Sequence, residues 1–216
     1  MERKSKVYKN VLDQKTIDAI NRFFDSTIAT ESNEYLEGAV ECINKHTDVQ
    51  DTNSFLGKIL LPKIRKAVGK NIEIDMSSRK SSIIPYGTHT DSHYRKGWEN
   101  IPRFIGDDDT ELHLSILIPL AQDPAFRTVT FNIFDFEYEG MSSTLPSEWL
   151  TSYNNLDPLD FLHCVNPDDI TKLPVDIDYT WSIGDIVVWP REQLHSSVDF
   201  RRYGKSSKEF IIIFSK

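Results

Sequence analysis

The feature that most limits how this chain can fold is a series of short alternating apolar runs, which begins near residue 70 and continues to the C-terminal end. In Leu112–Leu120, the apolar residues Leu114, Ile116 and Ile118 fall at alternate positions. Because successive side chains of a β-strand point to opposite faces of a sheet, this run predicts a strand with one buried face. Further candidate strands are Ile72–Met76, Val129–Phe134, Tyr179–Ile183, Ile186–Trp189 and Phe210–Phe214.

Turn residues separate these runs, and no long helical pattern lies between them. Many short strands with such punctuation are typical of an antiparallel sandwich or jelly roll. One segment, residues 138–178, interrupts the pattern. It contains Gly140, Pro146, Pro158, Pro167 and Pro174. A long irregular insertion can be a lid or binding loop, or an excursion over the surface, and the sequence leaves both open.

Residues 1–70 are predicted to be helical. The spacing of Ile17, Ile20 and Phe24 predicts a first helix with one apolar face, which Asp13 can cap at its N-terminus. A second helix is predicted from the spacing of Leu36, Val40 and Ile43.

A third helix is predicted to start after a capping residue in 51–53 and to bury a stripe that runs from Phe55 to Ile64. Pro62 predicts a kink or break in it, and Gly69 predicts its end. The chain is therefore expected to be one domain, residues 1–216, and mainly β. Its parts are a helical preface, 1–70, and a jelly-roll core flanked by helices, 71–216.

Charge and cysteine content narrow the possible partners and location. The net charge is −8, and the basic residues form no stripe that offsets it, which makes a nucleic-acid partner unlikely on electrostatic grounds. Cys42 and Cys164 give no disulfide framework, as expected for a protein of the reducing cytoplasm. The charged start and the lack of a long apolar run predict no membrane insertion.

The strongest functional signal is His89-Thr90-Asp91, together with His195 much later in the chain. On a strand, the side chains of His89 and Asp91 would point to the same face. With His195 from a distant strand they would form a set of two imidazoles and one carboxylate. Such a set on one face of a metal leaves the opposite coordination positions open, which suits non-haem Fe(II).

Two further features surround this set. A turn–strand–turn pattern, Gly184–Pro190, precedes His195, and the last apolar run, Glu209–Phe214, is led by the cation Lys208. In this order the motifs resemble the Fe(II)/2-oxoglutarate-dependent dioxygenase superfamily, in its prolyl-hydroxylase-like or phytanoyl-CoA-hydroxylase-like branch. The resemblance covers roughly residues 80–216. The fold of that family is a distorted jelly roll, the double-stranded β-helix, which agrees with the strand pattern.

The resemblance implies that His89, Asp91 and His195 are the catalytic metal ligands and that the cofactors are Fe(II) and 2-oxoglutarate, with O₂ as the oxidant. Related halogenases replace the carboxylate by a small residue so that chloride can bind the metal. Asp91 therefore favours hydroxylation or another oxidation. His93 would share a face with His89 and Asp91 on a regular strand, and it is an alternative ligand.

The family also places a cation near the start of the last strand, where it binds the distal carboxylate of 2-oxoglutarate. Distance along the chain from His195 favours Lys205, whereas strand phase favours Lys208, which shares a face with Phe210. Lys208 is the preferred candidate, and Arg202 is the third. Tyr86, just before the motif, is expected to contact the cosubstrate through its hydroxyl.

These features predict an oxygenase that hydroxylates a small molecule or a peptidyl side chain. The alternative is a non-catalytic or cupin-like metal-binding jelly roll without 2-oxoglutarate chemistry. Cupins usually recruit three histidines and a glutamate, and the spacing here does not supply them. The sequence leaves the identity of the substrate and the oligomeric state open.

Overall fold

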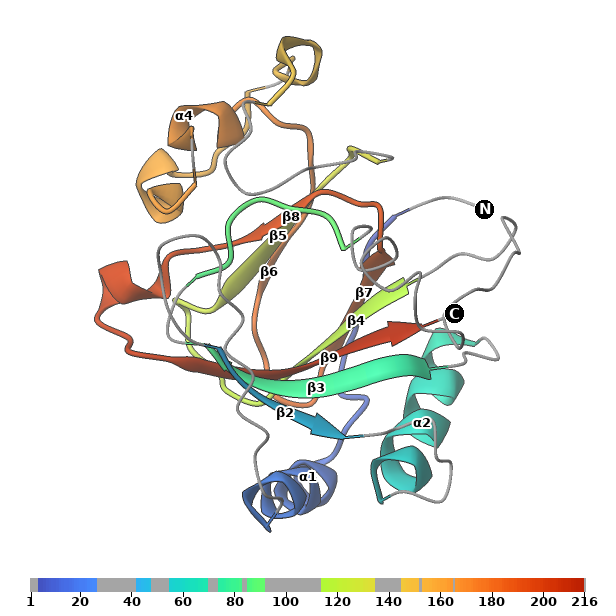
Figure 1. The fold of residues 1–216 in the computed structure, drawn as a ribbon. Coiled ribbons are helices and arrows are strands. Elements are labelled where there is room, and N and C mark those ends of the chain that lie inside the picture. Colours follow the sequence, from blue (N-terminus) through green and yellow to red (C-terminus); the bar gives the residue numbers. More distant parts are fainter. Residues whose placement is uncertain are drawn as a thin grey trace, which may run out of the picture.

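The structure, a computed structural model, describes residues 4–26, 42–47, 55–69, 74–82, 85–91, 114–134, 145–151, 153–164 and 166–215. In these segments two antiparallel sheets face each other (Figure 1). The larger sheet has the order β1-β7-β4-β9-β3-β2, and the smaller has the order β6-β5-β8. The strands are β1 Lys6–Tyr8, β2 Cys42–Thr47, β3 Ile74–Ser82, β4 Leu114–Pro119, β5 Arg127–Phe131, β6 Val175–Thr180, β7 Ile186–Pro190, β8 His195–Ser197 and β9 Lys208–Ser215.

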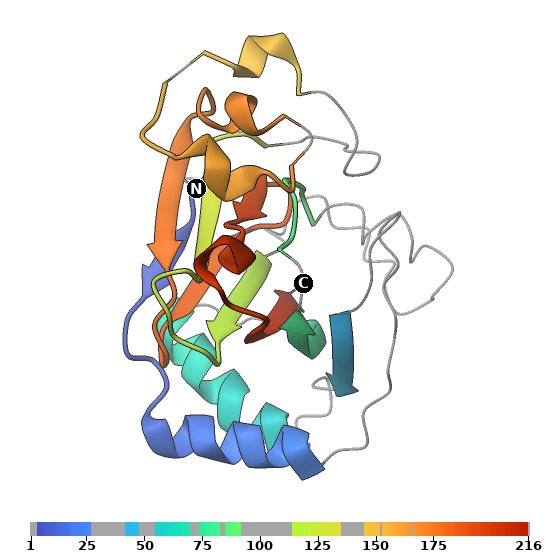
Figure 2. The same cartoon turned by 90° about the vertical axis from the view of Figure 1, so that its left-hand side faces the viewer.

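Two helices, α1 (Gln14–Ser26) and α2 (Phe55–Val68), cover the outer face of the larger sheet (Figures 1 and 2). Their apolar faces pack on alternate residues of the central strands, among them Ile116 of β4 and Ile211 of β9. The rings of Phe23 and Phe55 stack with centroids 4.9 Å apart and join the two helices. None of the described helices is long and apolar enough to cross a membrane.

The other face of the larger sheet looks inward, between the two sheets. Along β9, Phe210, Ile212 and Phe214 belong to this inner core, whereas Ile211 and Ile213 belong to the helix-covered core. Because both faces of β9 are buried, its sequence is an almost continuous apolar run. The period of two therefore divides the strand between two cores.

The described part of the predicted insertion, residues 145–151, 153–164 and 166–178, lies over the outer face of the smaller sheet (Figure 1). It forms short helical turns, η2 (Ser147–Trp149), η3 (Pro158–Phe161) and α4 (Pro167–Ile170), and then enters β6. A fourth turn, η4 (Phe200–Tyr203), precedes β9. Phe161 and Ile170 are fully buried against Val129 and Phe131 of β5, so this segment has a core of its own.

The predicted mainly-β, jelly-roll architecture is confirmed, but the region 1–70 is not wholly helical. β1 pairs with β7, and β2 pairs with β3, so both edges of the larger sheet come from this region. Ile43, assigned to a second helix, lies on β2, whereas Leu36 and Val40 fall outside the described residues. The helical spacing of three apolar residues was too short a signal to exclude an edge strand.

The first and third helices form as predicted, with one difference. Pro62 lies inside α2, which continues without a break from Phe55 to Val68. A proline removes only one backbone hydrogen bond, and the burial of Leu60 and Ile64 on the sheet holds the helix together around it. Gly69 ends the helix with a positive φ of 70° and an N–H bonded to the carbonyl of Arg65.

Several strand boundaries differ from the sequence pattern. β3 spans Ile74–Ser82 where Ile72–Met76 was predicted, and β5 spans Arg127–Phe131 where Val129–Phe134 was predicted. The run Tyr179–Ile183 belongs only in part to β6, which spans Val175–Thr180. β6 is an edge strand of the smaller sheet, and its apolar residues Val175, Ile177 and Tyr179 alternate, but residues up to 178 were assigned to the irregular insertion. His195 was expected on or near a strand, but the strand itself, β8 (His195–Ser197), was not delimited, because three residues give no period.

The N-terminal cap of α1 gives a pH-dependent prediction. The side-chain and backbone hydrogen bonds from Thr16 lower the pKa of Asp13 to about 2, with a smaller contribution from Lys63. The unfolded chain has the higher value of 3.8, so the stabilisation is present above about pH 4 and is lost as the pH falls toward 2.

We expect Asp13→Ala to lower the urea midpoint of unfolding near neutral pH, because the cap is lost. The gap between the variant and the original protein should narrow as the pH is lowered to about 3. Asp18→Ala, which removes an exposed carboxylate from the same helix, is the control. A gap that stays constant with pH would show that the carboxylate charge of Asp13 does not contribute.

Candidate metal centre

Backbone pairing brings the two halves of the His–Asp–His set together. The N–H of His89 donates to the carbonyl of His195 and the N–H of His195 donates to the carbonyl of His89, both over 2.9 Å. The N–H of Asp91 donates to the carbonyl of Arg191 at 2.8 Å. The segment that carries His89 and Asp91 is thus fixed beside the one that leads into β8.

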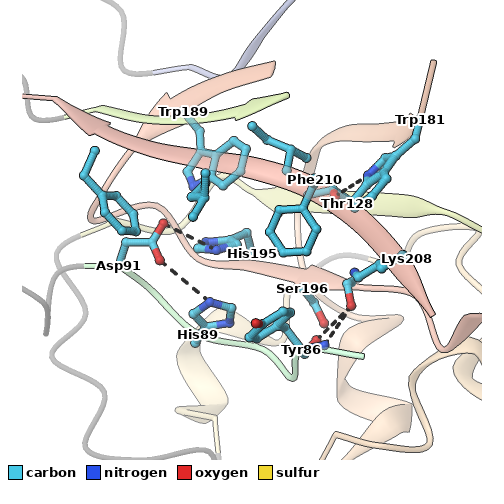
Figure 3. Close-up of a pocket in the computed structure, with 14 residues that line it drawn as sticks. Tyr86, His89, Asp91, Thr128, Trp181, Trp189, His195, Ser196, Lys208 and Phe210 are labelled. Carbon is cyan, nitrogen blue, oxygen red and sulfur yellow. Dashed lines mark hydrogen bonds and ion pairs between the residues drawn. The ribbon is translucent and has the colours of Figure 1, made fainter. Parts of the chain in front are cut away.

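The three side chains converge at one end of the space between the sheets (Figure 3). Nε2 of His89 lies 3.8 Å from Oδ1 of Asp91, and Nε2 of His195 lies 3.6 Å from Oδ2. One donor atom from each residue lies within 4.8 Å of the others, and Asp91 and His195 are buried. Two ligand atoms that each lie about 2 Å from the same ion are roughly 3 to 4 Å apart. The two separations from Asp91 fall in this range, so the set fits a metal.

Hydrogen bonds on the far side of each imidazole set its orientation. Nδ1 of His89 bonds the carbonyl of Gly87 at 2.7 Å, and Nδ1 of His195 bonds the carbonyl of Gln193 at 3.0 Å. A carbonyl only accepts, so Nδ1 carries the proton in both rings. The Nε2 lone pairs therefore face Asp91, which is the arrangement that metal-binding histidines use.

Asp91 is oriented by Ser115 from the middle of the larger sheet. The hydroxyl of Ser115, which is fully buried on β4, donates to Oδ2 of Asp91 at 2.5 Å. A short bond from a hydroxyl to a carboxylate is among the stronger hydrogen bonds in proteins. It fixes the carboxylate plane and leaves Oδ1 directed toward His89.

A cavity of about 520 Å³, its open mouth included, extends from these residues between the sheets. Apolar and aromatic side chains form most of its wall. The lining residues are Tyr86, His89, Asp91, Leu117, Thr128, Trp181, Trp189, His195, Ser196, Ser197, Lys208, Phe210, Ile212 and Phe214.

Lys208 lies in the same cavity, away from the His–Asp–His set (Figure 3). Its side chain is buried, and its ammonium lies 4.9 Å from the ring centroid of Trp181 and 5.5 to 5.7 Å from those of Tyr86, Phe200 and Phe210. Aromatic faces attract a cation at this range. The strand phase that favoured Lys208 places it on the same face as Phe210, as expected.

The two alternative cations point elsewhere. Lys205 forms an ion pair with Asp123 at 2.5 Å, and the hydrogen bond from Lys205 lowers the pKa of that carboxyl. Arg202 pairs with Asp157 and Asp160 behind η3. Neither side chain lines the cavity. Of the three candidate cations, Lys208 is therefore the one that lies in the cavity.

Tyr86 lines the cavity, and hydrogen bonds from two other segments hold its backbone in place. Its N–H donates to Oγ of Ser197, and its carbonyl accepts from Nε2 of His163 at 3.1 Å. Burial lowers the pKa of His163, so this imidazole is neutral at physiological pH. His163 and Cys164, whose thiol contacts Thr88 at 3.4 Å, belong to the insertion. In its described part, the insertion therefore supports the segment before His89 from behind.

One residue that the sequence singled out cannot be compared with the structure. His93, the alternative metal ligand, lies outside the described residues.

Sequence reasoning missed Ser115, the partner of Asp91, and several polar or aromatic residues that line the cavity: Thr128, Trp181, Trp189, Ser196 and Ser197. A signal for one of them was present. Ser115 falls at an odd position in the alternating run of β4, opposite to the face that carries Leu114 and Ile116. A lone hydroxyl between apolar residues of a buried strand needs a partner, and here the partner is Asp91.

No protein-family model and no curated protein matches the chain. Solved structures do match it. The non-heme alpha ketoglutarate dependent carbocyclase SnoK from nogalamycin biosynthesis superposes with a TM-score of 0.63 at 14% identity, over 100% of this chain and 80% of SnoK.

A second match is the epimerase SnoN in complex with Fe3+, alpha ketoglutarate and nogalamycin RO, with a TM-score of 0.56 at 14% identity, over 99% of this chain and 79% of SnoN. A third is an oxidoreductase of the 2OG-Fe(II) oxygenase family from Burkholderia pseudomallei, with a TM-score of 0.53 at 9% identity, over 100% and 86% of the two chains. At these identities the likeness establishes a shared fold.

Ser115 gives a test of how the carboxylate is positioned. Outer partners of metal ligands typically contribute about 10- to 100-fold to metal affinity, so Ser115→Ala should weaken Fe(II) or Mn(II) binding by about tenfold or more. Titration calorimetry under anaerobic conditions measures this affinity.

Ser215→Ala is the matched control, because Ser215 is also a fully buried serine at this sheet, but it accepts a hydrogen bond from the backbone of Leu114. It should leave metal affinity unchanged. Equal losses in both variants would attribute the effect to general disturbance of the sheet.

Proposed function

We propose that this chain is a non-haem Fe(II)- and 2-oxoglutarate-dependent oxygenase that hydroxylates or otherwise oxidises a small molecule or a peptidyl side chain. The observation that carries the proposal is one cavity with two distinct ends. His89, Asp91 and His195 lie at one end, and the buried ammonium of Lys208 lies at the other. The fold that holds this cavity is shared with proteins described as alpha ketoglutarate dependent.

The donor set supports iron as the resident metal. Two neutral imidazoles and one carboxylate on one side of an ion suit Fe(II), and three positions remain for exogenous ligands. A structural zinc site would be closed by a fourth protein ligand. Among the described residues, the only group of metal-binding side chains is His89, Asp91 and His195.

The charge at the far end supports a dicarboxylate cosubstrate. The ammonium of Lys208 is buried among aromatic rings in the wall of the cavity, where a carboxylate of a ligand could form a charge-assisted hydrogen bond with it. A 2-oxo dicarboxylate could chelate the metal with one end and place its distal carboxylate beside Lys208. We therefore assign Lys208 as the cosubstrate anchor and Tyr86, whose ring lies 5.7 Å from the ammonium, as its neighbour.

In the proposed reaction the chain binds, orients and excludes water. When bound, Fe(II) with 2-oxoglutarate and O₂ supplies an oxidant strong enough for C–H bonds, with succinate and CO₂ as coproducts. Asp91, fixed by Ser115, and the two imidazoles hold the metal. Trp181 and Phe210 wall the cavity and keep water from the charged groups, which strengthens their electrostatic interactions.

The direct test of the proposal uses the purified chain with Fe(II), 2-oxoglutarate and O₂, and measures succinate while candidate substrates are screened. Succinate that requires both Fe(II) and 2-oxoglutarate is the expected result. Tight metal binding without 2-oxoglutarate binding or turnover would favour a cupin-like metal protein. Binding of neither would favour a non-catalytic jelly roll.

Lys208→Ala tests the cosubstrate anchor. Loss of a charged hydrogen bond costs about 1.5–3 kcal/mol, so the KM for 2-oxoglutarate should rise about tenfold to a hundredfold while Fe(II) affinity changes little. Lys205→Ala, which removes an exposed lysine paired with Asp123, should leave the KM unchanged. The assignment is wrong if Lys205→Ala shows the larger rise.

Asp91 tests the type of reaction. Its carboxylate fills the coordination position that a halide would need, so we expect oxidised and never chlorinated product from the unmodified protein in chloride buffer, as measured by mass spectrometry. Asp91→Ala should lose most metal affinity and turnover, because a hard anionic ligand is gone. Full succinate formation by Asp91→Ala would show that Asp91 is not a metal ligand.

A further inference from the structure

Two tryptophans line the cavity, and they differ in one respect. Both are 2% exposed. Nε1–H of Trp181 donates to Oγ1 of Thr128 at 2.9 Å. Nε1 of Trp189 is equally buried and has no hydrogen-bond partner in the structure. Since indole nitrogen can only donate, an acceptor is missing at Trp189 and present at Trp181.

The position of Trp189 in the cavity limits which group of a ligand could be the acceptor. On β7, Val187 and Trp189 face the inner core, whereas Ile186 and Val188 face the helices. The Trp189 ring packs against His195 with centroids 5.0 Å apart. Figure 3 shows Trp189 on the side of the cavity where Asp91 and His195 lie, and not beside Lys208.

A buried donor without an acceptor destabilises a folded protein, and such donors are rare in native structures. Asn21, His163 and Arg191 also bury a side-chain polar atom without a hydrogen-bond partner, but among these four residues only Trp189 lines the cavity, where a bound ligand could supply an acceptor. Under the proposed function, the ligand nearest to the metal end is the 2-oxo acid head of the cosubstrate, which has carboxylate and keto oxygens and no donors. Its distal carboxylate would lie at the other end, with Lys208.

We infer that Trp189 is a cosubstrate-binding residue, whose indole N–H donates a hydrogen bond to an oxygen of the metal-bound 2-oxo acid head. The inference rests on the proposed function and adds a residue to it. The donor would fix the rotation of the head about the metal, while Lys208 fixes the far end. Two anchors at opposite ends of one small molecule determine its orientation.

The first test compares Trp189→Phe with Trp181→Phe, since both keep an aromatic ring and remove one indole N–H. Without ligand, Trp189→Phe should melt at the same temperature as the unmodified protein or higher, because an unpaired buried donor is removed. Trp181→Phe should melt lower, because Thr128 loses its partner. A merely structural role for Trp189 predicts a loss in both variants.

The second test measures affinity by titration calorimetry, with Mn(II) as a redox-inert metal. Mn(II) alone should bind Trp189→Phe and the unmodified protein equally. With Mn(II) present, 2-oxoglutarate should bind Trp189→Phe about tenfold or more weakly, as expected for a lost bond to a charged acceptor. Unchanged 2-oxoglutarate affinity together with a lowered melting temperature would overturn the inference.

A third measurement needs no change at Trp189. The chain has four tryptophans, so ¹⁵N-labelled protein gives few indole signals, which Phe variants at Trp98, Trp149 and Trp181 assign by elimination. With Zn(II) as a diamagnetic metal, 2-oxoglutarate should move the Trp189 indole proton downfield and slow its exchange with water. An indole signal that does not respond to bound 2-oxoglutarate contradicts the inference, even if Trp189→Phe fails to fold.

Failure of this inference and failure of the proposed function give different results. If the unmodified protein with Mn(II) or Zn(II) does not bind 2-oxoglutarate, the proposed function fails and the inference fails with it. If the unmodified protein binds 2-oxoglutarate and Trp189→Phe binds it equally well, only the role of Trp189 is refuted.

Discussion

The candidate site depends on the reciprocal pair of backbone hydrogen bonds between His89 and His195. This pair joins a segment with almost no secondary structure of its own to the three-residue strand β8. The approach to β8 is fixed in turn by Gln193, a fully buried residue whose side chain bonds Ser5, Asp176 and the carbonyl of Phe131. The ligand geometry is therefore set by backbone pairing and a buried polar network, and not by packing of the ligands themselves.

Charge is arranged along the cavity in a way that the net charge of the chain does not reveal. The protein is acidic as a whole, yet the cavity holds a buried cation at one end and a single carboxylate at the other. Electrostatic interactions are strong in such surroundings, because aromatic walls exclude the water that would screen them. An anion that spans the cavity would pair with Lys208 at one end and, at the other, with a metal ion that His89, Asp91 and His195 would hold.

The sequence predicted those parts of the molecule whose pattern is strong and repeated. The central strands β4, β7 and β9 were found because both of their faces are buried, which requires apolar residues at nearly every position. The His–Asp–His set and Lys208 followed from strand phase and family resemblance. The edge strands β1 and β2 were missed, because they lie in the region that was predicted to be helical, and β6 was found only in part. Ser115 and Trp189 were also missed. Ser115 stands out as a lone hydroxyl in an apolar run, but its contact with Asp91 and the place of Trp189 beside His195 depend on pairing between distant segments, which local spacing does not reveal.

Three residues that break the local burial pattern lie at the cavity or directly behind its metal ligands. Ser115 and Lys208 are a hydroxyl and an ammonium on otherwise apolar inner strands, and Trp189 buries a donor with no acceptor. A chain selected only for stability would replace each of them by an apolar residue of similar size, which is commonly neutral or stabilising at such positions. Three such exceptions around one cavity indicate that the cavity is built for a charged, oxygen-rich ligand, and that part of the stability of the fold is given up to bind it.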